Sequence, residues 1–193
     1  MNFDLGGVLR ALKPQKRIGA IEQRSDADQH WADGEAPIGG PLLLDTCVYL
    51  DVLQARTPAA VDILLGSRIC HHSAVSLAEL THLFGRLDPL HAATKGVLQR
   101  LRGAIDDIPK HRLHAPDAAA WGEAGILAGA LARLGDFPKG DGAIGKFLND
   151  ALIFLQARQL GASVLTRNIR DFDALEQLVP GGQVVFYRRA DPS

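Results

Sequence analysis

The sequence predicts an α/β fold with a mainly parallel central sheet. Short apolar segments of strand length alternate along the chain with longer segments of helical periodicity. Residues 42–44 form a wholly apolar run of the kind found in buried parallel strands. Val97, Leu101 and Ile105 repeat at the spacing of one helix face. Such alternation is typical of a parallel sheet covered by helices.

Turn and capping residues indicate where the elements begin and end. Thr57 and Pro58 suit the cap and the first position of a helix, and Gly161 suits the residue after one. Residues 45–56 are expected to form a loop. Strands are expected at residues 42–44, 68–72, 111–114, 163–166 and 183–187. Helices are expected at residues 57–65, 76–86, 91–105, 116–134, 147–160 and 171–178.

Residues 1–40 differ from the rest of the chain. Residues 5–22 predict one short amphipathic helix that Pro14 interrupts, and residues 26–35 are polar and carry both charges. The PIGGP stretch at residues 37–41 is typical of a boundary. We therefore expect an N-terminal extension over residues 1–40, disordered alone or bound to a partner, and a folded domain over residues 41–189.

The composition excludes several classes of protein. Lys plus Arg number 21 and Asp plus Glu number 22, so the net charge is −1, without the basic surplus of a protein that coats nucleic acid non-specifically. Cys47 and Cys70 form no CxxC pair, which favours a reducing, cytoplasmic compartment over a disulfide framework. No stretch approaches the roughly 20 apolar residues of a membrane span. The sequence thus indicates a soluble, cytoplasmic protein.

Four acidic residues stand where a predicted strand ends or a predicted helix begins. Asp45 follows the first strand directly, and Asp171 lies at the start of the last helix. Glu79 and Asp150 lie in the first turns of their predicted helices. In a parallel α/β sheet these positions share one edge, so the four acids are expected to converge there.

Each acid also has a purely structural interpretation. Ser76 and Glu79 fit a capping box, and a helix dipole would favour Asp150. Asp171 fits an N-cap, and Asp173 is its rival for the fourth acidic position. Converging carboxylates, however, repel one another unless a cation neutralises them, and oxygen ligands alone favour Mg²⁺ or Mn²⁺ over zinc. A magnesium site that also takes phosphate oxygens indicates phosphoryl chemistry.

Three motifs resemble those of PIN-domain nucleases and, among them, the VapC-like toxins of bacterial toxin–antitoxin pairs. They read LLLDTCVYLD, SAVSLAELTHLFG and NDALIFLQARQLGASVLTRN, the last followed by IRDFDAL, and the resemblance covers residues 41–187. It implies a PIN-like three-layer α/β/α fold and a Mg²⁺- or Mn²⁺-dependent endoribonuclease whose cut leaves a 5′-phosphate and a 3′-hydroxyl. It also implies one or two ions held by four acids, namely Asp45, Glu79, Asp150 and Asp171.

Residues beside these motifs are candidates for substrate contact. The Thr46 hydroxyl is placed to orient a carboxylate or to bind phosphate, and Arg167 and Arg170 are placed to contact phosphate unless they are solvated loop charges. The role of Asn168 stays open. By the resemblance, the chain would cleave RNA, form a homodimer and bind a small antitoxin. The helices over residues 81–105 carry apolar residues that would supply such a surface, namely Leu83, Phe84, Leu87, Leu90, Val97, Leu98 and Leu101.

Other interpretations of the chain are weaker. Residues 140–146 fit GxxxxGK, but Phe147 replaces the hydroxyl residue of a P-loop and no buried strand precedes the motif. A phosphatase of the haloacid-dehalogenase type needs a second Asp where Cys47 stands. His71 and His72 lack zinc-site spacing and favour a polar turn. A non-catalytic PIN module that binds RNA or a protein partner is the main alternative, and the presence of all four acids counts against it.

Overall fold

The computed structural model describes residues 3–135, 141–179 and 181–190, except for the side chains of 141–144. Within these residues the chain forms a five-stranded sheet in the order β3-β2-β1-β4-β5, and every neighbouring pair of strands is parallel. The strands are β1 Leu42–Leu44, β2 Cys70–Ser73, β3 Leu113–His114, β4 Ser163–Thr166 and β5 Val184–Phe186. The predicted α/β fold with a parallel sheet is confirmed.

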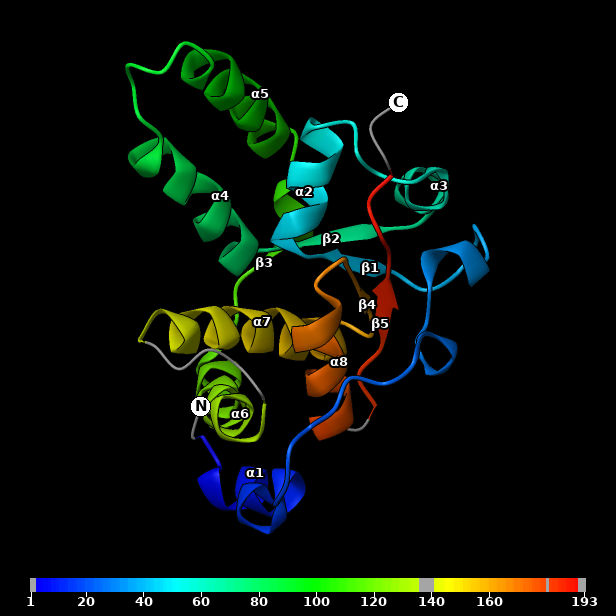
Figure 1. The fold of residues 1–193 in the computed structure, drawn as a ribbon, viewed down its shortest axis with the longest axis vertical. Helices are drawn as coiled ribbons and strands as arrows, with labels where there is room; N and C mark the ends of the chain where they lie inside the picture. The colour runs from blue at the N-terminus through cyan, green and yellow to red at the C-terminus, as the bar shows by residue number, and fades with distance from the viewer. Residues whose placement is uncertain (1–2, 136–140, 180, 191–193) are drawn as a thin grey trace.

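Helices cover both faces of this sheet (Figure 1). Leu43 and Val164 face a layer of α6, α7 and α8, against which α1 packs, whereas Leu42 and Leu165 face the layer formed by α2 to α5. The alternation follows from the two-residue period of a strand, and it confirms the three-layer arrangement. The helices are α1 Leu5–Leu12, α2 Thr46–Leu53, α3 Ala59–Ser67, α4 Ala74–Arg86, α5 Thr94–Asp106, α6 Ala118–Leu134, α7 Asp141–Gln159 and α8 Ile169–Leu178.

The register of the strands places the ends of β1, β2 and β4 side by side at the carboxyl edge of the sheet. Leu44 at the end of β1 pairs with His72 of β2 on one side and with Leu165 of β4 on the other. Asp45, which follows β1, therefore lies beside Thr166, the last residue of β4. The carboxyl edge of the sheet is where parallel α/β proteins assemble their sites.

Two predictions about the segment after β1 were wrong. Residues 46–53, expected as a loop, form α2, because Val48 and Tyr49 are buried against the sheet and tertiary packing stabilises the helix. The next helix, α3, begins at Ala59, later than expected, and the Thr57 hydroxyl donates to the Asp62 side chain at 2.6 Å instead of capping the helix.

The N-terminal segment packs along β5 and α8. The predicted break at Pro14 is confirmed, since α1 ends at Leu12 and a 3₁₀ turn starts at Pro14. Further on, Trp31 forms a parallel bridge with Phe186, and the Phe186 N–H donates to the His30 carbonyl at 2.7 Å. These contacts cover one edge of the sheet. The division between residues 1–40 and 41–189 stays a prediction.

Candidate functional site

Asp45 is held by side chains from two neighbouring strand ends. It is 5% exposed, and its Oδ2 accepts hydrogen bonds from Thr166 Oγ1 at 2.6 Å and from Cys47 Sγ at 2.9 Å. Although Asp45 occupies the N-cap position of α2, its side chain makes no capping hydrogen bond. The carboxylate is therefore fixed at the carboxyl edge for a purpose other than capping.

Asp150 and Asp171 reach the same edge from α7 and α8. One amide joins them, because Asn168 Nδ2 donates to Asp150 Oδ2 at 3.2 Å and to Asp171 Oδ2 at 2.9 Å. The Lys146 ammonium, one turn before Asp150 on α7, forms an ion pair with Asp171 Oδ2. Both Asp150 and Asp171 are buried, so these contacts replace most of their solvation.

The structural interpretations of Asp150 and Asp171 were wrong. The helix α7 starts at Asp141 rather than at Phe147, so Asp150 lies in the middle of the helix and not in its first turn. The cap of α8 is Asn168, and Asp171 lies inside the helix with its carboxylate directed at Lys146 and Asn168. A position in the first turn therefore does not account for Asp150, and an N-cap does not account for Asp171, which lies in the first turn of α8.

Glu79 lies next to this group with partners of its own. The Thr46 hydroxyl donates to Glu79 Oε2, and Asn149 Nδ2 donates to Glu79 Oε1 at 2.8 Å. The predicted capping box was wrong, because α4 begins at Ala74 and its cap is Ser73, whose Oγ accepts from the Val75 N–H at 3.1 Å. The carboxylate of Glu79 is thus available for the site, and Thr46 orients it.

Ser76, the other half of that predicted capping box, has a different role. Its Oγ donates to the Leu44 carbonyl at 3.2 Å, and the side chain is completely buried. The hydroxyl therefore ties α4 to the last residue of β1. This contact fixes the helix that carries Glu79 against the strand that leads to Asp45.

Negative charge is concentrated at this edge. Burial raises the pKa of Asp45, and the charge of Glu79 adds to the effect. Burial raises the pKa of Asp150 well above its usual range, and the charges of Asp45 and Asp171 raise it further. Burial alone would lower the pKa of Lys146, but its hydrogen bond with Asp171 and the three aspartate charges outweigh burial and raise it. The group of acids therefore favours a bound cation.

The four acids were expected to converge within reach of one cation, and the structure does not show that convergence. Within the described residues, no three Asp, Glu, His or Cys side chains surround a common point at the distances of metal ligands. Lys146 holds Asp171, while Thr46 and Asn149 hold Glu79. The donor chemistry still fits a hard divalent ion, since the acids offer oxygen atoms only and their charges repel one another. The assignment of the four ligands stays a prediction.

Asp171 and Asp173 turn in different directions. Asp173 is completely buried, and its carboxylate accepts from the Arg24 backbone N–H at 3.0 Å, from Arg24 Nε at 2.6 Å and from Gln177 Nε2 at 2.8 Å. These contacts attach the N-terminal segment to α8. The fourth acid at the carboxyl edge is therefore Asp171, and Asp173 has a structural role.

The two arginines proposed for phosphate contact lie outside the group of acids. Arg167 forms an ion pair with the buried Asp51, with Nε 2.7 Å from Oδ2, and Arg189 Nε pairs with the other oxygen of Asp51 at 2.7 Å. Arg170 lines a cavity of about 450 Å³ together with residues 20–23 and Asp173. Their role in substrate binding stays a prediction.

Sequence reasoning missed several residues of the site. Lys146 was visible only as the last residue of a rejected P-loop motif; in the structure it lies on α7, and Gly140 is outside the described residues. Thr166 gave one usable signal, because it ends the strand expected at residues 163–166 and so could be expected at the sheet edge where Asp45 lies. Asn149 and Cys47 gave no signal of their own.

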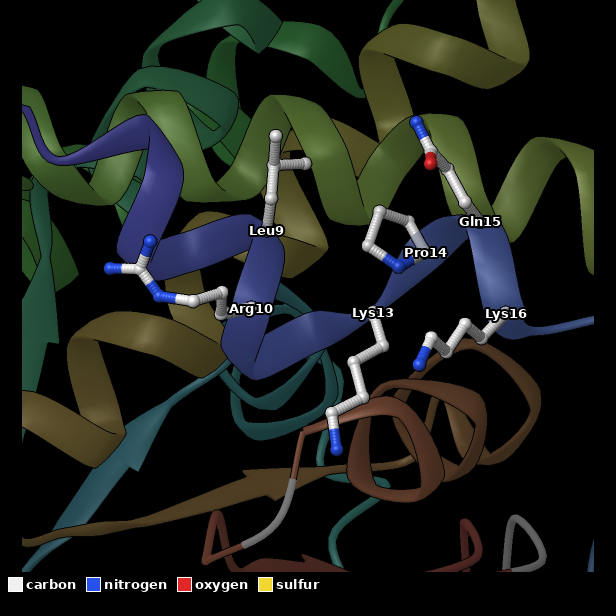
Figure 2. Close-up of a pocket in the computed structure, with 6 residues that line it drawn as sticks. All are labelled: Leu9, Arg10, Lys13, Pro14, Gln15 and Lys16. Carbon is white, nitrogen blue, oxygen red and sulfur yellow. The ribbon is translucent and has the colours of Figure 1, made fainter.

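The two histidines and the cavity described next lie away from the four acids. His71 and His72 lie in β2, as the strand expected at residues 68–72 implied, and not in a polar turn, because their backbones pair with β1. A cavity of about 290 Å³ lies on the N-terminal segment, and Figure 2 shows the residues that line it. None of the four acids lines it; its walls are Leu9, Arg10, Lys13, Pro14, Gln15 and Lys16. The acids at the sheet edge remain the strongest candidate site.

The fold is similar to that of several solved structures. A chain of VapBC2 from Rickettsia felis, bound to a DNA fragment from its promoter, aligns with a TM-score of 0.53 at 16% identity, over 77% of this chain and 99% of that one. A chain of FitAcB from Neisseria gonorrhoeae aligns with a TM-score of 0.52 at 25% identity, over 76% of this chain and 96% of that one. VapBC-1 from nontypeable Haemophilus influenzae gives a TM-score of 0.50 at 18% identity, over 76% and 97%.

The sequence comparisons give no further relative. No protein-family model matches the chain, and no curated protein sequence matches it. None of the helices in the described part of the chain has the length and apolar character that a bilayer crossing requires.

Proposed function

We propose that this chain is a Mg²⁺- or Mn²⁺-dependent endoribonuclease, the toxin of a toxin–antitoxin pair. The observation that carries the proposal is that Asp45, Asp150 and Asp171 lie near one another at the carboxyl edge of the sheet. Asp45 follows β1, whereas Asp150 lies on α7 and Asp171 on α8, and the pKa of Asp150 is raised by burial and then by the charges of the other two. Buried carboxylates that destabilise one another are costly unless they serve a cation.

Asp45, Asp150 and Asp171 would hold the ion, with Glu79 closing the site. When bound, a divalent ion polarises the scissile phosphate and lowers the pKa of its bound water. Each ligand is already oriented by a polar neighbour: Thr166 on Asp45, Asn168 on Asp150 and Asp171, and Thr46 on Glu79. Such outer contacts fix the direction of ligand oxygens before the ion arrives.

Two further features of these residues suit a hydrolytic site. Glu79 is half-buried and accepts a hydrogen bond at each carboxylate oxygen, from Thr46 and Asn149, so the direction of both oxygens is fixed. Cys47 stays a neutral donor to Asp45, because burial and the charge of Asp45 raise the pKa of the thiol well above its usual range. No protein nucleophile is required, since water attacks the phosphorus.

The structural comparisons supply the context of the proposal. The similar chains belong to VapBC and FitAcB structures, and FitAcB reaches 25% identity over most of its length. By analogy, we propose that this chain binds a small antitoxin whose segment reaches the acids, and that it forms a homodimer. Two exposed apolar residues, Phe84 on α4 and Leu90 in the loop between α4 and α5, support a partner surface there.

The test is cleavage of single-stranded RNA by the purified chain, with Mg²⁺ or Mn²⁺ and with chelator. Asp45→Asn keeps the shape and the Thr166 hydrogen bond but removes a ligand charge, so activity should fall at least about a hundredfold while the fold is retained. Asp106→Asn is the matched control, because Asp106 is exposed on α5. Unchanged cleavage by Asp45→Asn would contradict the mechanism. RNA or protein binding without any metal-dependent cleavage would support the non-catalytic alternative.

A further inference from the structure

The ion pair between Lys146 and Asp171 lies inside the proposed metal site. Lys146 and Asp150 are four residues apart on α7, a spacing that places both side chains on one face of a helix. From that face the Lys146 ammonium reaches Asp171 on α8, whose Oδ2 it shares with the Asn168 amide. The ammonium thus stands among the same carboxylates that would surround an ion.

We propose that Lys146 is a tethered cation that occupies the metal position and has to withdraw from Asp171 before a divalent ion can bind there. The inference rests on the proposed function, because it concerns the same acids. The Lys146 ammonium would then compete with the metal ion for the site even when no partner protein is bound.

Charge balance is the first argument. Three buried or nearly buried aspartates at one edge require positive charge, and a lysine supplies one unit without leaving the chain. A divalent ion supplies two units at the same place. Both cations would share Asp171 as a ligand, and like charges at that separation repel strongly. Simultaneous occupancy by the ammonium and the ion is therefore disfavoured.

The freedom of the lysine is the second argument. The Lys146 side chain is 58% exposed, whereas Asp171 is 3% exposed in the same ion pair. The long, flexible stem of a lysine can turn its ammonium into solvent without any change in the helix. Asp171 has no such freedom, because Asn168 holds it from the other side. Withdrawal of Lys146 is thus a rotation of one side chain.

The consequence is a lowered affinity for the metal. When only a fraction of molecules have the site open, the apparent dissociation constant rises by the inverse of that fraction. If Lys146 occupies the acids in about nine of ten molecules, removing its charge should tighten metal binding about tenfold. The lysine would thereby set the metal concentration at which the site is filled.

The experiment is calorimetric titration of the metal-free, full-length protein with Mn²⁺. Lys146→Gln should bind Mn²⁺ about tenfold more tightly than the unmodified chain, while Lys146→Arg, which keeps the charge, should stay within about threefold of it. Lys95→Gln removes the same charge from an exposed position on α5 and should change nothing. Circular dichroism checks that each variant is folded.

Equal or weaker Mn²⁺ binding by Lys146→Gln would overturn the proposal. Asp45→Asn separates this failure from failure of the proposed function. If Asp45→Asn weakens Mn²⁺ binding but Lys146→Gln leaves it unchanged, the metal site stands and Lys146 does not compete for it. If neither the unmodified chain nor Lys146→Gln binds Mn²⁺, both proposals fall.

Discussion

Asn168 holds two carboxylates together with one amide nitrogen. Asn168→Asp would remove the donor and add a negative charge beside Asp150 and Asp171, so we expect a loss of stability in chelator of about 1–3 kcal/mol. In a chain of this length that corresponds to a fall in Tm of roughly 2–4 °C per kcal/mol. Thermal unfolding followed by circular dichroism measures the change.

Added Mn²⁺ should act in the opposite direction on this variant. The extra carboxylate is a further oxygen ligand, and an ion stabilises the folded state more as its affinity rises. Mn²⁺ should therefore raise the Tm of Asn168→Asp more than that of the unmodified chain. Gln99→Glu adds the same charge at an exposed position on α5 and is the control. A Tm in chelator equal to that of the unmodified chain would mean that the amide bridge contributes nothing.

At the level of single residues, sequence motifs single out the acids, whose role as ligands stays a prediction, but they do not single out the residues that contact the acids. Asp45, Glu79, Asp150 and Asp171 stand in motifs whose order reflects the order of strands and helices. Thr166 and Asn149 contact those acids across long sequence separations, and such contacts depend on the register of β1 against β4 and on the rotation of α7. No local pattern encodes either quantity.

Among the helices and strands, those with a clear local sequence pattern were predicted, whereas α2, which tertiary packing stabilises, was not. The apolar strand Leu42–Leu44 and the strand Ser163–Thr166 were predicted with their correct bounds. The helix α2 was missed because its apolar residues surround the axis instead of forming one stripe. Its only charged residue, Asp51, is completely buried and contacts Arg167, Arg189 and Tyr187. Sequence periodicity does not predict a buried charge of this kind.

The attachment of the N-terminal segment to α8 depends on Arg24. Its guanidinium pairs with the fully buried Asp173 and with Glu176, on the same helix that carries Asp171. Arg24→Gln would leave the Asp173 carboxylate buried without its charge partner, so we expect a loss of about 3 kcal/mol or more in the free energy of unfolding. Urea denaturation measures it.

Arg10→Gln is the control for this prediction. Arg10 pairs with Asp4 at 4.0 Å, and both side chains are about three-quarters exposed, so its loss should cost less than about 1 kcal/mol. Deleting residues 1–40 removes Arg24 together with the Trp31 bridge to Phe186, and should destabilise the chain at least as much as Arg24→Gln. A truncated chain with unchanged stability would support an independent domain over residues 41–189.

For the whole molecule, a fall in pH changes the free energy of unfolding in two opposite ways, because the pKa of His72 is lowered while those of Asp45 and Asp150 are raised. Burial lowers the pKa of His72 to about 4 from an ordinary 6.5, and the positive charges of Arg112, His71 and His114 assist. Because the folded value lies below the unfolded one, His72 stabilises the fold above about pH 6.5 and loses that contribution as the pH falls through 4. Asp45 and Asp150, with raised pKa values, gain stability from protons as the pH falls.

Comparing the unmodified chain with His72→Asn isolates the contribution of His72 from that of the two aspartates. In His72→Asn the side-chain amide can replace the hydrogen bond between the Tyr49 hydroxyl and His72 Nδ1, which lie 2.6 Å apart, but the new side chain does not titrate. The unmodified chain should therefore lose up to about 3 kcal/mol relative to this variant between pH 7.5 and pH 4. Urea denaturation at a series of pH values gives the difference. A difference that does not vary with pH would show that His72 does not titrate abnormally.

The α4–α5 pair projects from the body of the molecule (Figure 1) and divides its apolar residues between core and surface. Leu101 is 1% exposed and belongs to the core, whereas Phe84 is 41% and Leu90 is 91% exposed. Core packing explains why Leu101 is apolar, but it does not explain the exposed apolar side chains of Phe84 and Leu90. If they form a dimer interface, Phe84→Ser combined with Leu90→Ser should weaken self-association at least about tenfold, since exposed aromatic anchors dominate such contacts.

Sedimentation equilibrium between about 1 and 100 µM covers the range in which a specific dimer of ordinary strength dissociates. Ile18→Ser is the matched control, because Ile18 is 89% exposed but lies on the N-terminal segment, away from α4 and α5. Removing it should leave the association unchanged. A strict monomer throughout this range, or a double variant that associates as well as the unmodified chain, would contradict the dimer. The nuclease proposal would be unaffected, because every acid that it requires comes from a single chain.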